Sequence, residues 1–298
     1  MTHGNAAVLC IGVFDGVHRG HRSLIDEGRR QATVLHLPLT AVTFDPHPMG
    51  VVSSERAPAS LATLEHRVAL LREAGADDVD VLAFDQQMAA LTPREFIERE
   101  LVGRLGARAV VVGEDFRFGH GATGSIVTLQ DEGARLGFSA TGVPLVGDGP
   151  ERWSSTAIRG QVQAGDMEAA AAGLGRLYAL DGEVVHGDHR GRELGYPTAN
   201  LAWAHNPVIP ADGVYAGWLL DAGERLPAAV SVGTNPQFNG RDRRVEAHVI
   251  DRTGLDLYGD QVRVEFLERL RDQATFDDVP GLMRQMDLDV DRARRLTR

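Results

Sequence analysis

The sequence predicts two domains of different class: an α/β domain with a parallel, doubly wound sheet, then an all-β domain with an antiparallel barrel and a terminal helix. Three observations support this prediction. The length of 298 residues fits two domains of ordinary size. Strand-like and helix-like segments alternate up to about residue 143, which is typical of a parallel sheet. Beyond residue 178 the strand-like segments follow one another closely, with turn residues between them, which indicates a barrel.

The elements of the first domain are predicted by short apolar runs and by helical spacing. We expect strands over residues 8–12, 39–44, 79–84, 109–113 and 139–143. We expect helices over residues 21–31, 64–73, 92–101 and 126–136. The third helix opens on a capping box, since Thr92 is followed by Pro93 and then by Glu95. The run at 109–113 has no polar alternation, as expected for a central strand covered on both faces.

The second domain follows one or two short helices that we expect over residues 156–174. Strands are predicted over 180–185, 214–220, 228–232, 245–250 and 262–267, and a terminal helix over 277–295. In that helix Leu282, Met286 and Val290 recur at the spacing that buries one face. We therefore place the two domains at residues 1–172 and 178–298.

Charge and composition exclude several classes of function. All 31 basic residues are arginine, so the chain has no lysine for a P-loop, a pyridoxal phosphate linkage or a lysine general base. The net charge of -11 argues against nucleic acid and against an anionic membrane as partners, because both require a broad basic surface. Any phosphate chemistry must use arginine, histidine, backbone amides or a metal ion.

Cysteine usage and apolar runs indicate the compartment. Cys10 is the single cysteine, so the chain forms no intramolecular disulfide. No apolar stretch approaches the ~18 residues of a membrane span, and the first residues lack the pattern of a signal peptide. We expect a cytoplasmic protein without a membrane partner, and the sequence leaves a homo-oligomer open.

The loop after the first predicted strand is the most informative segment of the first domain. It reads G-x-F-D-G-V-H-x-G-H and leads into a helix, the place where open α/β sheets bind ligands. His18 and His21 can donate to triphosphate oxygens as charge builds during transfer. A zinc pair and a capped structural turn are the alternatives. Glycines and free amides at the helix start favour phosphate binding. The residues that we expect to bind ATP phosphate in this segment are Gly12, Phe14, Asp15, Gly16 and Gly20.

This segment contains the H-x-G-H signature of nucleotidyltransferases. Its longer form resembles the FMN adenylyltransferase module of the bacterial bifunctional riboflavin kinase/FAD synthetase family. Three further segments match that module in order: T-F-D-P-H-P at 43–48, V-G-E-D-F-R-F-G at 112–119 and S-S-T-A-I-R at 154–159. The resemblance implies a Rossmann-like nucleotidyltransferase domain that transfers AMP from ATP to FMN.

The resemblance assigns flavin contacts to the first two of these segments. Asp45, Pro46 and His47 would bind the flavin, although a rigid proline turn also explains them. Asp115 stands where the family often has Asn and would hydrogen-bond the flavin ring or ribityl chain. Phe116 would lie against the flavin, with a place in the hydrophobic core as the alternative.

The third segment lies at the start of a predicted helix. The resemblance implies that Ser155 and Thr156 offer hydroxyls and amides to ATP phosphate, with Arg159 one turn further on for charge pairing. An ordinary N-cap followed by a solvated arginine is the plainer explanation. Since FMN already carries an ionised phosphate at neutral pH, its adenylylation would need positioning and charge stabilisation but no strong base.

In the second domain, residues 182–201 resemble the riboflavin kinase signature, which ends in P-T-A-N. Thr198 and Asn200 are two residues apart on an extended chain, so their side chains point to the same side. Their oxygens can complete the shell of Mg²⁺, beside phosphate oxygens and water. The glycine-rich run at 187–195 would cover ATP, or it is a surface loop without a ligand. Its predicted ATP-binding residues are Gly187, Arg190, Gly191 and Gly195.

The strand R-V-E-A-H at 244–248 resembles the one that carries the catalytic base of this kinase family. Glu246 would accept the proton of riboflavin's primary hydroxyl, which is a poor nucleophile. Without the resemblance, a glutamate in a charged strand more often faces solvent. The chain departs from the family pattern at Gln273 and Thr275, where an acidic and a basic residue are usual, in a loop that borders the flavin site of relatives.

The resemblance covers about residues 7–295 and implies a bifunctional enzyme. It would phosphorylate riboflavin with ATP to FMN and then adenylylate FMN with a second ATP, giving FAD and pyrophosphate. ATP, riboflavin and FMN would be its ligands and Mg²⁺ its cofactor, with Arg159 and Arg190 supplying fixed positive charge. Two alternatives stay open: a nucleotidyltransferase for another phosphorylated acceptor with a degenerate barrel, and a non-catalytic flavin sensor.

Overall fold

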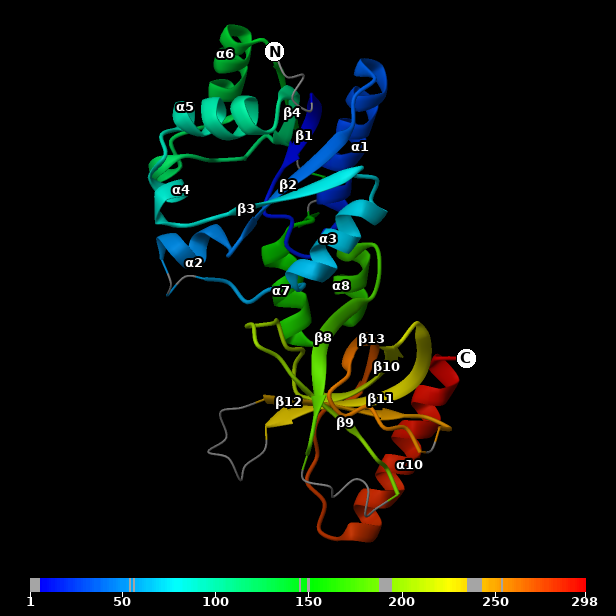
Figure 1. Ribbon diagram of the computed structural model, residues 1–298. Helices are drawn as coiled ribbons and strands as arrows, with labels where there is room; N and C mark the ends of the chain where they lie inside the picture. The colour runs from blue at the N-terminus through cyan, green and yellow to red at the C-terminus, as the bar shows by residue number, and fades with distance from the viewer. Residues whose placement is uncertain are drawn as a thin grey trace. The chain divides into compact units, whose positions relative to one another are not determined.

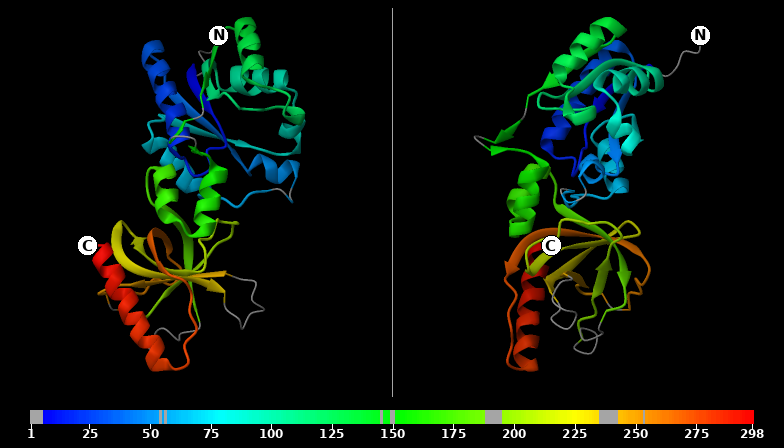
Figure 2. Two further views of the ribbon diagram at one scale, coloured as in Figure 1. Left: turned by 180° about the vertical axis from the view of Figure 1, so that it is seen from behind. Right: turned by 90° about the vertical axis from the view of Figure 1, so that its left-hand side faces the viewer.

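The structure, a computed structural model, has two compact units, each with its own hydrophobic core (Figures 1 and 2). The first unit consists of Met1–Pro58 and Leu64–Ser154, and the second of Ala59–Thr63 and Ser155–Arg298. The segment 59–63 therefore joins the second unit, although the residues on either side of it belong to the first. The structure describes residues 6–53, 55, 57–144, 146–148, 151–187, 195–234, 243–252 and 254–298.

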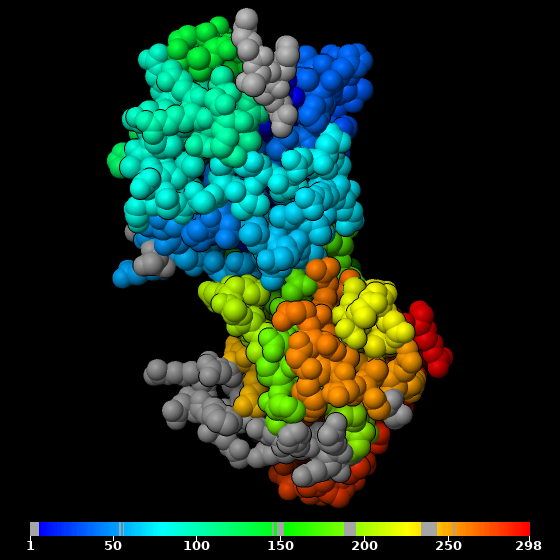
Figure 3. Space-filling view, viewed as in Figure 1, coloured from blue at the N-terminus to red at the C-terminus, as the bar shows by residue number. Residues whose placement is uncertain are grey.

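The first unit is built on a five-stranded parallel sheet, which confirms the predicted α/β class. In space the strands follow the order β3 (Asp78–Ala83), β2 (Leu39–Asp45), β1 (Ala7–Ile11), β4 (Ala107–Gly113) and β5 (Ser139–Val143). Val8 of β1 is in register with Leu39 on one side and with Ala109 on the other. All of β1 is buried, and the strand is almost hidden in the space-filling view (Figure 3).

Helices cover both faces of this sheet because successive side chains of β1 point to opposite sides. Cys10 packs with residues of α1 (Arg19–Leu35) and α3 (Leu64–Glu73). Leu9 packs on the opposite face with residues of α5 (Pro93–Phe96), η2 (Ile97–Arg104) and α6 (Ile126–Leu136). The predicted capping box forms at the start of α5, where the Thr92 hydroxyl accepts from the backbone N–H of Glu95. The longer helices are α1 (Arg19–Leu35), α3 (Leu64–Glu73), α5 (Pro93–Phe96), which continues as the π-helical η2 (Ile97–Arg104), and α6 (Ile126–Leu136). The shorter elements are α2 (Pro48–Val52), α4 (Gln86–Ala90), η3 (His120–Ala122) and the small hairpin of β6 (Gly147–Asp148) and β7 (Glu151–Arg152).

The second unit contains a closed antiparallel barrel, as the sequence predicts. Around the barrel the strands follow the order β10 (Gly213–Asp221), β11 (Glu224–Thr234), β12 (Arg243–Val249), β9 (Ala199–Ala202), β8 (Tyr178–Val185) and β13 (Gln261–Arg271). The sequence does not predict β9 as a strand, because its four residues, A-N-L-A, include no β-branched or aromatic side chain. The terminal helix α10 spans Val279–Leu296, close to its predicted bounds.

Two short helices share the core of the barrel. They are α7 (Ser155–Ala164) and α8 (Met167–Leu174), which confirm the predicted helical stretch before the barrel. Ile158 and Val162 of α7 are buried in the same cluster as Tyr178 and Phe266 of the barrel strands. The structure therefore packs residues 155–174 with the second unit, although the sequence analysis groups most of them with the first domain.

Candidate active sites

The first candidate site lies where β1 gives way to α1. His18 is the N-cap of α1, and its Nδ1 accepts a hydrogen bond from the backbone N–H of His21 at 3.3 Å. The neutral ring of His18 therefore carries its proton on Nε2. The two imidazole rings stack with their centroids 3.6 Å apart, and His18 is 5% exposed. The structure thus brings the two predicted histidines together at the positive end of a long helix.

The loop before His18 has a strained backbone. Phe14 has a φ of 54° and Val17 a φ of 39°, both in the left-handed region, as does Gly16 with 77°. For phenylalanine and valine this conformation costs on the order of 1–3 kcal/mol each, and such residues cluster at ligand-binding sites. Gly20 is needed for a different reason: a Cβ at this position would lie 3.0 Å from the His18 ring. The glycines of the motif therefore shape the loop and make room for the stacked histidines.

This geometry bears on the two alternatives to phosphate binding. A purely structural turn gains nothing from left-handed Phe14 and Val17, since glycine adopts such conformations at little cost. A zinc pair needs further ligands, and within the described residues no group of three His, Cys, Asp or Glu side chains could hold a metal ion. The arrangement of His18 and His21 supports a pair of hydrogen-bond donors at a helix start.

A second strand end contributes to the same edge of the sheet. β1 lies between β2 and β4, so the strand order reverses beside it, and ligands of open α/β sheets bind at such a point. Asp115 and Phe116 follow β4, and Asp115 is exposed there. Phe116 is half-buried, with its ring centroid 5.6 Å from that of Phe118. Phe118 is part of the core, which leaves Phe116 as the partly accessible member of the pair.

The loop after β2 ends at the same edge. Asp45 and Pro46 are exposed, and the peptide bond between them is cis. His47 is the N-cap of α2, because its Nδ1 accepts from the backbone N–H of Met49 at 3.1 Å. A helix cap thus accounts for His47 without a ligand, and the flavin contacts of these three residues stay a prediction.

The residues predicted to bind ATP phosphate beyond this loop fall in the second unit. α7 begins at Ser155, so the predicted helix start is confirmed. Ser155 is half-buried and Thr156 is exposed. Arg159 is half-buried, and its Nε donates to the carbonyl of Ala59 at 2.7 Å, so it is not the solvated arginine of the plainer explanation. The role of these residues toward ATP phosphate stays a prediction.

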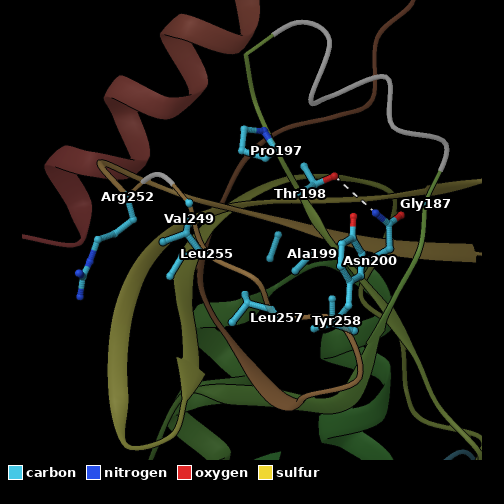
Figure 4. A pocket seen from close by; sticks show the side chains of 13 residues that line it. Gly187, Pro197, Thr198, Ala199, Asn200, Val249, Arg252, Leu255, Leu257 and Tyr258 are labelled. Atoms are coloured by element: carbon cyan, nitrogen blue, oxygen red, sulfur yellow. Dashed lines mark hydrogen bonds between the residues drawn. The ribbon is translucent and has the colours of Figure 1, made fainter.

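The barrel carries a cavity of about 280 Å³ around Thr198 and Asn200, the pair of residues predicted to bind one Mg²⁺ ion. The Nδ2 of Asn200 donates to the Thr198 hydroxyl at 3.5 Å, so the two side chains lie on the same side of the chain, as Figure 4 shows. A Cβ on Gly187 would lie only 2.4 Å from the Asn200 side chain, which explains why this position is a glycine. Apolar side chains form much of the remaining lining, among them Val184, Val249, Leu255, Leu257 and Tyr258.

A larger cavity of about 600 Å³ lies between the outer face of the barrel and α10. Glu246 lines it, together with Thr198, which therefore borders both cavities. The apolar face of α10 lines the opposite side through three half-buried residues: Leu282, Met286 and Val290. Their spacing predicts one buried face, and Val290 does pack against a buried cluster of the barrel and α10. Leu282 and Met286 instead lie along the cavity.

Strand register explains how Glu246 comes close to the metal pair. Glu246 of β12 is directly paired with Asn200 of β9, and Ala247 with Ala199. Residues opposite one another in an antiparallel pair project from the same face of the sheet. Ala199 and Ala247 are both buried in the barrel core, so Glu246 and Asn200 project from the outer face. The predicted base and one predicted metal ligand are thus neighbours.

Several other predicted residues of this site can be placed. Gly195 is exposed and has a φ of 87°, which favours glycine. Arg190 and Gly191 lie outside the described residues. Gln273, one of the two departures from the family pattern, lines the larger cavity, and its Nε2 donates to the carbonyl of Val232 at 2.8 Å.

One contact beside the larger cavity has no local signal in the sequence. The hydroxyl of Tyr196, just before the P-T-A-N segment, donates to the Asp287 carboxylate of α10. This hydrogen bond raises the pKa of Tyr196 to about 12. His248 follows Glu246 on the same face, and its Nδ1–H donates to the carbonyl of Pro197 at 2.9 Å. The signal available in the sequence was the position of Tyr196 beside the metal pair, but nothing there indicates a partner 91 residues away.

Comparison with known proteins agrees with both halves of this description. A family model described as FAD synthetase matches residues 1–157, and one described as riboflavin kinase matches residues 174–297. A bifunctional riboflavin kinase/FMN adenylyltransferase of Escherichia coli K12 is 38% identical over 288 residues, which cover 96% of this chain and 91% of that protein. The protein of the same description from Bacillus subtilis 168 is 32% identical over 294 residues, covering 97% and 92%.

A solved structure supports the similarity over the full length. It is the crystal structure of a protein from Streptococcus pneumoniae described as a macrolide-efflux protein, with a TM-score of 0.86, 32% identity, and coverage of 99% of this chain and 95% of that one. Within the described part of this chain, no helix is long and apolar enough to cross a membrane. Two family matches and near full-length relatives confirm the resemblance: the chain belongs to the family of bifunctional riboflavin kinase/FMN adenylyltransferases.

Proposed function

We propose that this chain phosphorylates riboflavin with ATP to give FMN and then adenylylates FMN with a second ATP to give FAD and pyrophosphate. Family membership supports both reactions. The observation that carries the kinase assignment is that Thr198 borders two cavities on the barrel, one of about 280 Å³ and one of about 600 Å³. Two ligands in these cavities would meet beside Thr198, as transfer of a phosphoryl group requires.

The smaller cavity suits ATP with Mg²⁺. The Thr198 hydroxyl and the Asn200 side-chain carbonyl are neutral oxygen donors on one side of the chain, and oxygen is the ligand that Mg²⁺ prefers. Because Gly187 has no Cβ, the side chain of Asn200 fits next to Thr198. These residues fit a magnesium ion that takes its other ligands from phosphate and water. When bound, Mg²⁺ would neutralise charge that develops on the transferring phosphate.

The larger cavity suits riboflavin. Its apolar lining, which includes Val214, Phe276 and Met286, offers a surface for a flat aromatic ring system. Glu246 lies in the same cavity and would accept the proton of riboflavin's primary hydroxyl as the phosphoryl group is transferred. A positioned carboxylate base typically contributes about 10²–10⁴-fold to such a step. Its pairing with Asn200 would keep this carboxylate next to a phosphate held by Mg²⁺.

The first site suits adenylyl transfer. His18 and His21 would donate to the phosphates of ATP, and the strained loop with the following helix start would supply backbone N–H groups. The FMN phosphate would attack the α-phosphorus of ATP and release pyrophosphate, with no base needed to ionise it. Further residues that we assign to this reaction are Asp45, Pro46, His47, Asp115 and Phe116 for the flavin, and Ser155, Thr156 and Arg159 for phosphate.

We also propose where the two functional domains divide and in which cellular compartment the protein acts. We assign residues 1–172 to adenylyl transfer and 178–298 to phosphorylation, supported by family matches that end at 157 and begin at 174. We place the protein in the cytoplasm, where ATP for both reactions is supplied.

A product assay tests the proposed function. Purified protein is incubated with riboflavin, ATP and Mg²⁺, and flavins are separated by chromatography over time. We expect FMN to form first and FAD to follow at its expense. Binding of riboflavin and FMN without any turnover would instead support a flavin sensor, and turnover of FMN but not of riboflavin would leave one working site.

A further inference from the structure

Arg67 carries no motif in the sequence, yet it is one of the most deeply buried charged residues of the first unit. Its side chain is 8% exposed, and it lies in the first half of α3. Burial lowers the pKa of its guanidinium, while the nearby carboxylates of Asp15 and Asp45 oppose this shift. A charge this deep is kept in proteins only where it is paired and hydrogen-bonded.

The contacts of Arg67 join two segments of the candidate adenylyltransferase site, the loop after β1 and the end of β2. Its Nη1 donates to the carbonyl of Val13, in the loop after β1, at 2.9 Å. Its Nη2 lies 3.9 Å from the carboxylate of Asp45, the last residue of β2. The planar guanidinium with its several donors can reach both at once, which an ammonium group could not do in the same way. Arg67 therefore links the predicted nucleotide loop with the predicted flavin loop.

The Val13 carbonyl lies directly before the strained backbone and accepts the hydrogen bond from Arg67. It accepts a second hydrogen bond from the Thr43 hydroxyl, also at 2.9 Å. The next residue is Phe14, whose φ of 54° is unfavourable for an L-amino acid with a large side chain. Such a conformation persists where the surrounding structure fixes it from several directions. Two donors on the Val13 carbonyl fix the peptide that enters the strained segment, five residues before His18.

We propose that Arg67 is a positioning residue for adenylyl transfer, which holds the loop from Gly12 to Val17 and thereby sets the place of His18 and His21. This inference rests on the proposed function of the first site. Arg67 acts through the loop and touches neither substrate, and Thr43 assists it from β2. The loop would still form without the guanidinium, but with its carbonyl no longer fixed the histidines would miss the geometry of transfer.

The test compares Arg67→Met with Arg67→Lys, Thr43→Val and a matched control. Arg29→Met is the control, because Arg29 also donates to a backbone carbonyl, that of Gly75, and pairs with an aspartate, Asp77, at 2.8 Å. Arg29 lies on α1 about two helical turns beyond His21, outside the motif. Steady-state adenylylation of FMN and phosphorylation of riboflavin are both measured on each variant, so that the barrel of the same chain reports the amount of chain in each assay.

Arg67→Met should lower kcat for adenylylation by about 10²-fold with KM for ATP and FMN nearly unchanged, since misplaced catalytic groups act on the transition state. Arg67→Lys should recover part of this loss, because it keeps the charge near Asp45. Thr43→Val removes one hydrogen bond at constant volume and should lower kcat about fivefold. Phosphorylation of riboflavin should be unchanged in all of them, and Arg29→Met should adenylylate FMN normally.

The proposal is overturned if Arg67→Met adenylylates FMN at the wild-type rate, or if Arg67→Met and Arg29→Met lose activity together in proportion to loss of folded protein. If Arg67→Met does not fold in its first unit, Thr43→Val decides, and a wild-type kcat there overturns the proposal. Failure of the proposed function has a different signature: the wild-type chain itself would not convert FMN to FAD.

Discussion

The two candidate sites of this chain are assembled in opposite ways. In the first unit, His18, His21 and the strained loop come from one contiguous segment that joins β1 to α1. In the barrel, Thr198, Glu246 and the apolar face of α10 come from three separate segments that meet around one cavity. Local assembly at a helix start suits a site that needs backbone amides, whereas assembly across strands allows a carboxylate, a metal pair and an apolar pocket to be combined.

The chemistry of the two proposed acceptors accounts for this difference. The FMN phosphate is ionised at neutral pH, so a site for its adenylylation needs donors and positioning rather than a base. The riboflavin hydroxyl is a weak nucleophile and needs a general base next to the metal-bound phosphate. In the barrel, the direct pairing of Glu246 with Asn200 places a carboxylate beside a predicted metal ligand. The rate of riboflavin phosphorylation should therefore depend strongly on one carboxylate, whereas the rate of FMN adenylylation should not.

The largest expected effect follows from removing that carboxylate. Glu246→Gln should lower the rate of riboflavin phosphorylation by about 10²–10⁴-fold, because the amide cannot accept the proton. Adenylylation of supplied FMN by the same variant should proceed at the wild-type rate. Both rates are measured by chromatographic separation of riboflavin, FMN and FAD.

The matched control is Glu183→Gln, since Glu183 is an exposed glutamate on another strand of the same barrel, β8. It should leave both activities unchanged. Riboflavin phosphorylation at the wild-type rate by Glu246→Gln would mean that the base has been misassigned and that the contrast between the two sites is wrong.

A smaller effect is expected from a substitution beside Asn200, one of the two predicted Mg²⁺ ligands. In Gly187→Ala the new Cβ would lie 2.4 Å from the Asn200 side chain and displace it. The Mg²⁺ concentration for half-maximal riboflavin phosphorylation should rise about tenfold, a shift typical of disturbed ligand orientation. Titration of activity with Mg²⁺ measures this shift, and the adenylylation of FMN should keep its wild-type dependence on Mg²⁺.

Gly160→Ala serves as the control for this substitution, because a Cβ at that helical position meets nothing within 4 Å. An unchanged Mg²⁺ requirement in Gly187→Ala would argue that Asn200 does not hold the metal.

Most of the fold could be predicted from local sequence patterns. The helix over residues 64–73 and the strand over 139–143 agree with the predicted bounds, because apolar spacing and flanking glycines mark them clearly. β9 could not be predicted, since its strand character comes from pairing with β8 and β12 rather than from its own residues. The placement of residues 155–174 with the barrel core also depends on tertiary packing that helical spacing does not encode.

In the candidate sites, too, local features could be predicted and features that depend on tertiary packing could not. The pairing of His18 with His21 could be predicted because both residues lie in one turn of a helix. The contact of Tyr196 with Asp287 and the role of Leu282 as cavity lining could not, since both require knowledge of where α10 lies on the barrel. Arg67 was missed for a similar reason: a single arginine in a helix has no local signal that it reaches Val13.

If one chain holds two independent sites with distinct chemistry, two variants that each lack one activity should complement each other in a mixing experiment. Glu246→Gln alone, given riboflavin, ATP and Mg²⁺, should form almost no FMN. His21→Ala alone should accumulate FMN and form FAD about 10²–10³-fold more slowly than the wild-type chain. Combined in one tube, the two variants should restore conversion of riboflavin to FAD, with FMN passing between them. No FAD from the mixture, or loss of FMN formation in His21→Ala, would contradict this account.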